Sequence, residues 1–190
     1  MTGLFFGSFN PIHNGHLDIA GYILDKGLCD EIYFVVSPRN PLKLDDSLLD
    51  ENKRLEIVSA AIAHDRRMKA CDIEFSMPKP SYTIDTLNKL SSFYPQSEFA
   101  LIIGGDNLRD FHLWKDYREI AARYKIIVYP RPGVETHSPD FPDIEFVNAP
   151  LSGISSTEIR KKIQNGEDIA NFVPGCVLNP IFRYYKEMLR

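Results

Sequence analysis

The sequence of 190 residues has few cysteines, no surplus of positive charge and no long apolar run. Its three cysteines, Cys29, Cys71 and Cys176, are widely separated and form no C-x-x-C pair, so neither a disulfide framework nor a zinc knuckle is expected. The net charge is -4 and the pI about 5.7, whereas nucleic acids and membrane surfaces are usually bound by a basic field. No apolar run reaches the roughly 18 residues of a membrane span. Neither nucleic acid nor membrane is therefore expected as a partner.

These absences leave a globular protein of the cytoplasm, where scattered cysteines stay reduced. Hydrophobic residues make up 44% of the chain and charged residues 25%. No basic leader precedes the first apolar residues, so a signal peptide is not expected. A chain of this length suits one core, and residues 1–190 are expected to form a single domain.

Short apolar runs alternate with amphipathic stretches along the chain. Strands are predicted at 3–6, 31–37, 69–75, 97–106, 125–133 and 144–148. Helices are predicted at 16–27, 51–65, 81–94, 116–124, 155–166 and 180–189. In the helix at 81–94, Ile84, Leu87, Leu90 and Tyr94 are predicted to point inward. The alternation predicts an α/β fold, an open and mainly parallel sheet of five or six strands with helices on both faces.

Polar clusters follow the predicted strands at five places. They lie at 7–16, 37–43, 104–107, 130–133 and 152–157. Loops are polar in most proteins, but the loops at the carboxyl ends of parallel strands also form the ligand site of such sheets. The five clusters are therefore expected to converge on one edge of the sheet.

The first cluster reads GSFNPIHNGH and introduces a predicted helix. Gly7 permits close approach of a ligand to the backbone, and Asn14 is the predicted N-cap. The free amides and positive dipole end of the helix form an anion site. His16 falls in the first turn, where the dipole disfavours an imidazolium unless a negative group arrives.

His13 and His16 are candidates for phosphate binding, for metal binding or for packing. No nearby Cys, Asp or Glu completes a metal-ligand set, which favours phosphate. The loop lacks the G-K-[ST] of a Walker A motif, so the P-loop mechanism is excluded.

A second anion site is predicted at SGISSTEIR. Ser155 and Glu158 have the spacing of a capping box, and Ser156 and Thr157 add hydroxyl groups beside the same free amides. This is either a well-capped helix or a phosphate site. Arg160 favours the latter because helical side chains lean toward the N-terminus. Two helix N-termini, two histidines and this arginine suit a triphosphate.

Three other features lie at the same edge. Gly104 permits close approach of a ligand to the backbone. Asp106 is a candidate for accepting hydrogen bonds from ribose hydroxyls or for capping the next short helix. Trp114 is a candidate for stacking on a heterocycle or for packing. Basic residues on these loops, each a candidate for phosphate contact or for solvation, are Arg39, Lys43 and Arg131.

Taken together, these motifs resemble the H-x-G-H nucleotidyltransferase superfamily, which also carries [IV]-S-S-T-x-[IV]-R. The segments SYTIDTL (81–87), GGDNL (104–108), W-K-D-Y and RPG (131–133) narrow the resemblance to the bacterial nicotinate mononucleotide adenylyltransferases. The resemblance spans the chain from Gly7 to Arg160. It implies a Rossmann-like fold and a step of NAD biosynthesis, in which ATP and nicotinate mononucleotide give nicotinate adenine dinucleotide and pyrophosphate.

The resemblance also implies roles for individual residues. The catalytic residues are His13, His16 and Arg160. The ATP-binding residues are Gly7, Ser8, Phe9, Gly15, Gly104, Asp106, Ser155, Ser156 and Thr157. The mononucleotide-binding residues are Lys43, Tyr82, Thr83, Trp114 and Arg131. Mg²⁺ accompanies ATP, and no metal is held by the protein itself. The family often has Asp in place of Asn10, and His in place of Leu42.

Other functions compete with this interpretation. The acceptor is nicotinamide mononucleotide in the nearest alternative. SYTIDTL and Trp114 argue against a third acceptor, phosphopantetheine. A metal-dependent phosphoesterase using His13 and His16 is an alternative of a different class, as is a nucleotide sensor without catalysis.

Overall fold

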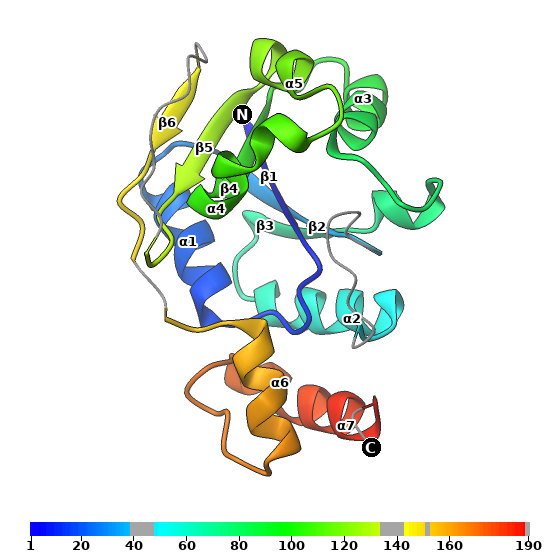
Figure 1. The fold of residues 1–190 in the computed structure, drawn as a ribbon, viewed down its shortest axis with the longest axis vertical. Coiled ribbons are helices and arrows are strands. Elements are labelled where there is room, and N and C mark those ends of the chain that lie inside the picture. The colour runs from blue at the N-terminus through cyan, green and yellow to red at the C-terminus, as the bar shows by residue number, and fades with distance from the viewer. Residues whose placement is uncertain (39–47, 134–142, 151–152, 189–190) are drawn as a thin grey trace.

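The computed structural model describes residues 1–38, 48–133, 143–150 and 153–188 (Figure 1). Six strands form one sheet in the order β3-β2-β1-β4-β5-β6, and all five pairings are parallel. The strands are β1 (Thr2–Gly7), β2 (Glu31–Val36), β3 (Met68–Cys71), β4 (Phe99–Gly104), β5 (Lys125–Tyr129) and β6 (Ile144–Phe146). This is the Rossmann-like order, and it confirms the parallel sheet expected from the sequence.

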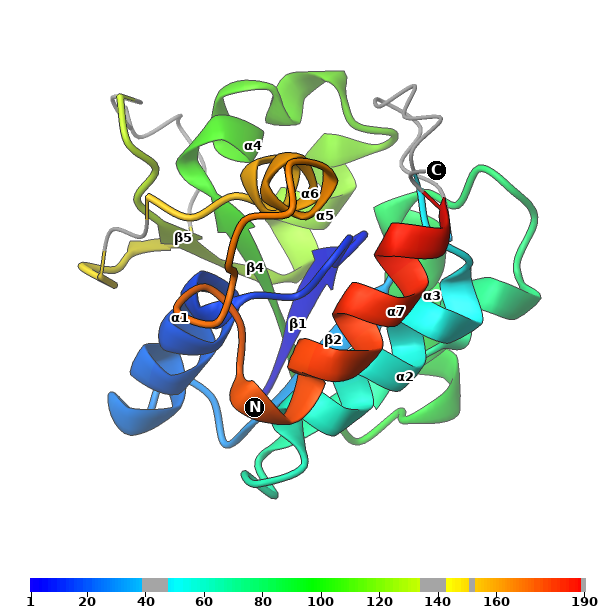
Figure 2. The same cartoon turned by 90° about the horizontal axis from the view of Figure 1, so that it is seen from below.

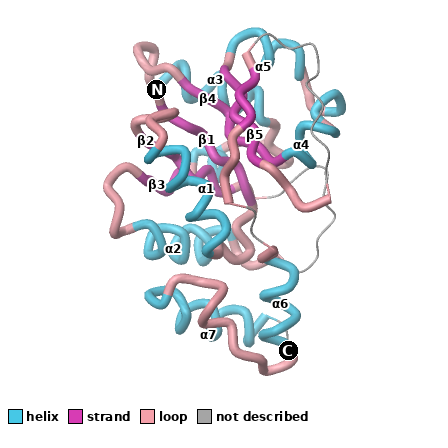
Figure 3. Tube along the Cα trace, turned by 90° about the vertical axis from the view of Figure 1, so that its left-hand side faces the viewer, coloured by secondary structure: helices cyan, strands magenta, loops and turns pink. Residues whose placement is uncertain are grey.

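Helices cover both faces of the sheet. They are α1 (Asn14–Asp25), α2 (Glu51–Ile62), α3 (Thr83–Phe93), α4 (Gly105–Arg109), α5 (Tyr117–Arg123), α6 (Ser156–Gln164) and α7 (Leu178–Met188). Short 3-10 turns are η1 (Ile73–Ser76), η2 (Phe111–Leu113) and η3 (Gly175–Val177). Figure 2 shows α7 beside α2, and Figure 3 shows α6 and α7 together at one end of the molecule. None of the helices in the described ranges is long and apolar enough to cross a membrane.

The two faces have separate apolar clusters because side chains alternate along each strand. Phe5 and Ile102 join α1, α2, α6 and α7 in one cluster. Leu4 and Leu101 join α3, α4 and α5 in the other. Strands buried on both faces explain the continuous apolar runs of the sequence.

The strand order reverses direction between β1 and β4. Chain leaving β1 enters α1 on one face, whereas chain leaving β4 enters α4 on the other. Loops part at such a switch point and open a crevice for ligands. The first polar cluster and GGDN follow the two strands that flank it.

Three predictions of local structure were wrong. The strand predicted at 69–75 ends at Cys71, and the chain turns into η1, where Glu74 is buried. Tyr94, predicted inward, is 48% exposed because α3 ends at Phe93. The N-cap of α1 is His13 and not Asn14. The side-chain amide of Asn14 instead donates to the carbonyl oxygen of Asn171 at 3.2 Å.

Candidate active site

The loop after β1 and the first turn of α1 carry four of the predicted ATP-binding residues. Gly7 ends the strand, and its carbonyl accepts from the Ser37 N–H at 2.9 Å. Phe9 has a φ of +44°, a conformation uncommon for a residue with a side chain, and its ring is 2% exposed. Only the main chain of Phe9 can therefore meet a ligand. Gly15 is buried in the first turn of α1.

The two histidines of this loop lie against each other. Their ring centroids are 3.7 Å apart with an angle of 26° between the planes, and Nδ1 of His16 accepts from the backbone N–H of His13 at 3.3 Å. His13 is 3% exposed, and its Nδ1 has no hydrogen-bond partner within the described ranges. A buried nitrogen of this kind is available to a ligand.

Both histidines have depressed pKa values. Burial, and then the positive charge of Arg131, lowers the pKa of His13 to about 4. Burial also lowers the pKa of His16, with further contributions from His13 and Arg131. Both rings are therefore neutral at pH 7 without a ligand, and each can donate one N–H. An anion bound beside them would favour the protonated form.

The amino end of α6 lies directly against this loop. The Ser155 hydroxyl accepts from the backbone N–H of Glu158 at 3.2 Å, as the predicted cap requires. The Ser156 hydroxyl donates to the carbonyl of Pro11 at 2.9 Å. Arg160 Nη1 donates to the carbonyl of Asn10 at 2.8 Å. The two predicted anion sites are thus neighbours, 145 or more residues apart in sequence.

Arg160 leans toward the amino end of its helix, as predicted. Its Nη2 lies 3.4 Å from the hydroxyl oxygen of Thr157, one turn earlier. The guanidinium therefore lies near the free amides of α6.

Asn10 is a structural centre of the first loop. Its side chain is 1% exposed, and its Oδ1 accepts from the Leu49 N–H at 3.1 Å and from the Tyr185 hydroxyl at 2.7 Å. The amide side chain therefore ties the loop to α7 and to the segment before α2.

Asp106 and Arg131 meet at the exits of β4 and β5. Arg131 Nε lies 3.5 Å from Asp106 Oδ1, and Arg131 Nη2 donates to the Tyr129 hydroxyl at 3.2 Å. A Cβ on Gly104 would lie 2.4 Å from the same Asp106 oxygen, so this close approach requires glycine. The sequence assigned Asp106 and Arg131 to different substrates, whereas the structure places them side by side. Arg131 is also close enough to lower the pKa values of both histidines.

Tyr82 and Thr83 form the turn into α3, and the segment bearing Trp114 packs beside it. Lys115 Nζ lies 2.8 Å from both carboxylate oxygens of Asp85 and 5.2 Å from the centroid of the Tyr82 ring. The Tyr82 side chain is 38% exposed. Trp114 Nε1 is buried without a hydrogen-bond partner in the part of the chain that the structure describes. The structure thus brings the predicted pyridine-binding residues together. Arg39 and Lys43 lie outside the described residues.

Sequence reasoning missed Arg54, which is fully buried in α2. Its guanidinium donates to the carbonyl oxygens of Leu49, Ser8, Ser37 and Pro38, at distances of 2.7, 2.5, 2.9 and 3.2 Å. Burial lowers its pKa. The spacing contained a clue, because Arg54 lies three and four residues before buried Ile57 and Val58, on the same helical face.

Glu74 was missed as well. This carboxylate is 2% exposed and accepts from the hydroxyls of Ser81 and Thr86 at 2.7 and 2.8 Å. No local pattern indicated burial of an acidic residue here.

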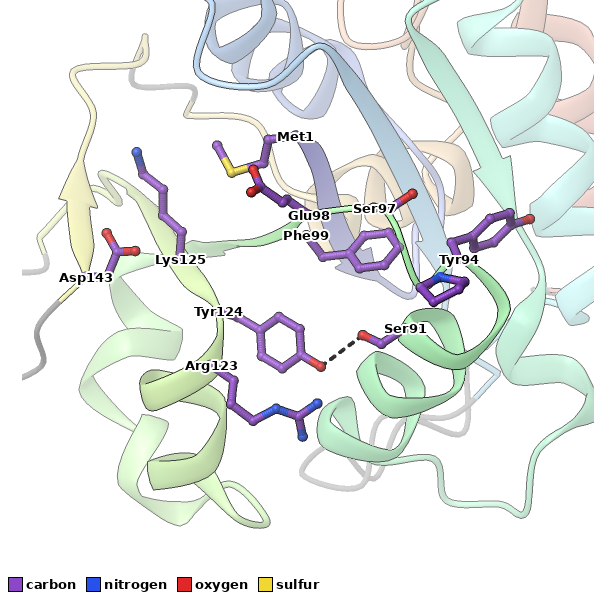
Figure 4. A pocket seen from close by; sticks show the side chains of 11 residues that line it. Met1, Ser91, Tyr94, Ser97, Glu98, Phe99, Arg123, Tyr124, Lys125 and Asp143 are labelled. Atoms are coloured by element: carbon purple, nitrogen blue, oxygen red, sulfur yellow. Dashed lines mark hydrogen bonds between the residues drawn. The ribbon is translucent and has the colours of Figure 1, made fainter.

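A larger cavity, of about 510 Å³, lies at the opposite edge of the sheet (Figure 4). Its lining includes Phe99 and Lys125, at the amino ends of β4 and β5, and Tyr124, whose hydroxyl pairs with that of Ser91 at 3.1 Å. Its basic side chains are paired, Lys125 with Glu145 at 2.5 Å and Arg123 with Glu119 at 2.5 Å. A smaller crevice at the carboxyl edge is lined by His13, His16 and Arg131. Parallel sheets bind ligands at this edge, so the smaller crevice is the better candidate.

No group of three His, Cys, Asp or Glu side chains in the described ranges is placed to hold a metal ion. Three protein ligands are the usual set of a catalytic zinc site. This donor set therefore gives no support to a phosphoesterase centred on His13 and His16.

A parallel sheet in this order, with two helix N-termini close to paired histidines at its carboxyl edge, defines an α/β protein with an anion site at the switch point of its sheet. A family model described as cytidylyltransferase-like matches residues 4–162, so the chain belongs to that family. Within it, the chain belongs to the nicotinate-nucleotide adenylyltransferases, as its similarity to curated relatives of that name shows.

Two of these relatives carry the name probable nicotinate-nucleotide adenylyltransferase. The Cytophaga hutchinsonii protein is 48% identical over 172 residues, which cover 90% of this chain and 90% of that protein. The Azobacteroides pseudotrichonymphae protein is 46% identical over 186 residues, 95% of this chain and 98% of that protein. Among solved structures, the nicotinic acid mononucleotide adenylyltransferase of Plasmodium falciparum complexed with NaAD has the same fold. Its TM-score is 0.83 at 22% identity, over 100% of this chain and 98% of that one.

Proposed function

We propose that the chain transfers AMP from ATP to the 5′-phosphate of nicotinate mononucleotide, giving nicotinate adenine dinucleotide and pyrophosphate. The observation that carries the proposal is the contact between the amino end of α6 and the loop after β1, through Ser156 and Arg160. Two helix N-termini that share one space suit the several charges of a triphosphate. The names of the curated relatives and the NaAD complex of the Plasmodium enzyme support the same reaction.

In this proposal the ATP phosphates lie between the loop after β1 and the amino end of α6. The main chain of Gly7, Ser8, Phe9 and Gly15 and the side chains of Ser155, Ser156 and Thr157 hold them. Asp106, beside Gly104, accepts hydrogen bonds from the ribose. The carboxylate exchanges its contact with Arg131 for these bonds, which releases the arginine for a phosphate of the mononucleotide.

The proposed transfer needs no protein nucleophile. An oxygen of the mononucleotide phosphate attacks the α-phosphorus in line, and the bond from that phosphorus to the oxygen bridging the β-phosphate breaks. The electron pair leaves with pyrophosphate. His13, His16 and Arg160 stabilise charge on the bridging and leaving oxygens. The histidines, neutral before ATP binds, become better donors as the phosphates arrive.

We propose that Mg²⁺ arrives with ATP and is held by phosphate oxygens and water, the mode that this cation prefers in nucleotide enzymes. Such a cation supplies charge neutralisation at the phosphates.

The pyridine ring of the acceptor is placed against Trp114 and the turn at Tyr82 and Thr83. The free backbone amides at the start of α3 favour a carboxylate over a carboxamide. Nicotinate is therefore the proposed acceptor, with Lys43 a further candidate for the phosphate. We also propose that residues 1–190 act as one domain, because one apolar cluster contains side chains from α1, α2, α6 and α7. The three free cysteines fit a place in the cytoplasm.

The test measures pyrophosphate released from ATP with nicotinate and nicotinamide mononucleotides side by side. Faster release with the nicotinate form is expected. Release with the nicotinamide form alone would overturn the choice of acceptor. ATP binding without pyrophosphate from either would leave a nucleotide sensor, and orthophosphate release dependent on zinc or manganese would indicate a phosphoesterase.

A further inference from the structure

Glu74 holds a carboxylate inside the protein without an ion pair in the described part of the chain. It lies in η1, and its two oxygens accept from the hydroxyls of Ser81 and Thr86 at 2.7 and 2.8 Å. All three side chains are buried, with exposed fractions of 2%, 8% and 0%. A buried carboxylate is costly unless strong hydrogen bonds hold it, so this arrangement depends on both hydroxyls.

The two hydroxyls stand on either side of the turn that begins α3. Ser81 immediately precedes Tyr82 and Thr83, and Thr86 lies three residues after Thr83. Thr86 is tied to the turn itself, since its backbone N–H donates to the Tyr82 carbonyl at 3.1 Å and its Oγ1 lies 3.3 Å from the same oxygen. Glu74 therefore fixes the first turn of α3 from both sides.

The side chains of the SYTIDTL segment (81–87) therefore have different roles. Ser81 and Thr86 hold Glu74, and Asp85 holds Lys115 at 2.8 Å. Tyr82 and Thr83 remain at the exposed turn, where the proposed function places the pyridine ring of the acceptor.

We propose that Glu74 is a positioning residue for the mononucleotide. It touches no substrate, and it holds the first turn of α3 so that the amides of that turn point at the nicotinate carboxylate. The inference rests on the proposed function. Loss of Glu74 should therefore weaken binding of the mononucleotide and not of ATP, because Glu74 supports the proposed acceptor site and not the loop after β1 that holds ATP.

The experiment compares KM for nicotinate mononucleotide and KM for ATP in Glu74→Met and Glu74→Gln. Methionine removes both carboxylate oxygens that accept hydrogen bonds from Ser81 and Thr86. It should raise KM for nicotinate mononucleotide about tenfold and leave KM for ATP within about twofold of wild type. Glutamine keeps one acceptor oxygen, and its NH₂ can donate to the other hydroxyl oxygen. It should therefore restore most of the affinity for the acceptor.

Leu90→Ala is the matched control. Leu90 lies in the same helix, is 1% exposed, and sits one turn before its carboxyl end. The control should lower the melting temperature, as Glu74→Met does, yet leave both KM values near wild type. Should Glu74→Met fail to fold, Thr86→Val removes one hydroxyl at constant shape and should still raise the acceptor KM about threefold.

The outcomes separate the inference from the proposed function. An unchanged acceptor KM in Glu74→Met, or equal rises in both KM values, would overturn the positioning role while leaving the reaction intact. Wild-type protein that releases no pyrophosphate with either mononucleotide would overturn the proposed function, and the role of Glu74 with it.

Discussion

Replacing Arg54 with methionine should lower the free energy of unfolding by about 4 kcal/mol. The change removes a fully buried guanidinium and keeps an apolar side chain about as long as the stem of the arginine. The carbonyl oxygens of Ser8, Ser37, Pro38 and Leu49 then lose the donor that the structure gives them. These carbonyls belong to the loops after β1 and β2 and to the segment before α2.

The magnitude follows from the four hydrogen bonds. A hydrogen bond from a charged donor contributes roughly 1.5 to 3 kcal/mol, and the three contacts of 2.5 to 2.9 Å are short for such a donor. The contact to Pro38, at 3.2 Å, is weaker. Burial lowers the pKa of Arg54, which shows that burying its charge is unfavourable. The methionine variant no longer carries that cost, and this offsets part of the lost hydrogen-bond energy. About 4 kcal/mol remains, and Arg54→Lys should lose about half of that, since it keeps the charge without the planar set of donors.

Urea unfolding followed by circular dichroism measures these differences, provided that the slope with urea stays constant. Arg66→Met is the control, because Arg66 is exposed in the turn that follows α2 and should change stability by less than about 0.5 kcal/mol. A loss below about 1 kcal/mol in Arg54→Met would refute the reasoning, as would a lysine variant as stable as wild type.

Three further predictions concern the site. His16→Ala should lose about a hundredfold in turnover, roughly 3 kcal/mol, while His64→Ala at an exposed position keeps its rate; near-normal turnover in the first variant would remove His16 from the mechanism. Because the pKa of His13 is about 4 in the folded protein and 6.5 in an unperturbed histidine, the unfolded chain binds the extra proton between these pH values. Stability should therefore fall by up to about 3 kcal/mol as the pH drops through this window, and unfolding curves of His13→Asn should show a weaker dependence. Gly104→Ala places a Cβ 2.4 Å from an Asp106 oxygen and 3.1 Å from Arg131 Nε, and it should raise KM for ATP several-fold, about 1 kcal/mol, and more than it raises KM for the mononucleotide; equal rises in both would point to a general distortion.

Much of the fold was accessible from the sequence because its determinants are local. Apolar runs at β1, β2, β4 and β5 are continuous, which is typical of strands buried on both faces. Glycine and proline clusters mark where these strands end. The rule that ligands bind at the carboxyl edge then brought the separate polar clusters to one place, and the contacts of Ser156 and Arg160 with the first loop confirm that two of them meet.

The remaining features depend on partners that are distant in sequence. Arg54 is buried because Ser8, 46 residues earlier, offers it a carbonyl oxygen, and Glu74 is buried because Ser81 and Thr86 fold back over it. Propensity favours Asn14 as the cap of α1, but the carbonyl of Asn171 competes for its side chain. The functional roles of the individual site residues remain predictions, because they depend on where substrates bind.

The hydrogen bond from Tyr185 to Asn10 has a consequence for how the protein is made. It joins residues 175 positions apart and ties the last helix to the loop that carries the histidines. The described sheet strands are all synthesised before α7, so the loop gains this support only after α7 has been synthesised. Contacts of such long range carry a large loop-closure entropy, which slows their formation. Nascent chains ending before α7 should therefore already contain the parallel sheet, but acquire ATP affinity only when the last helix docks.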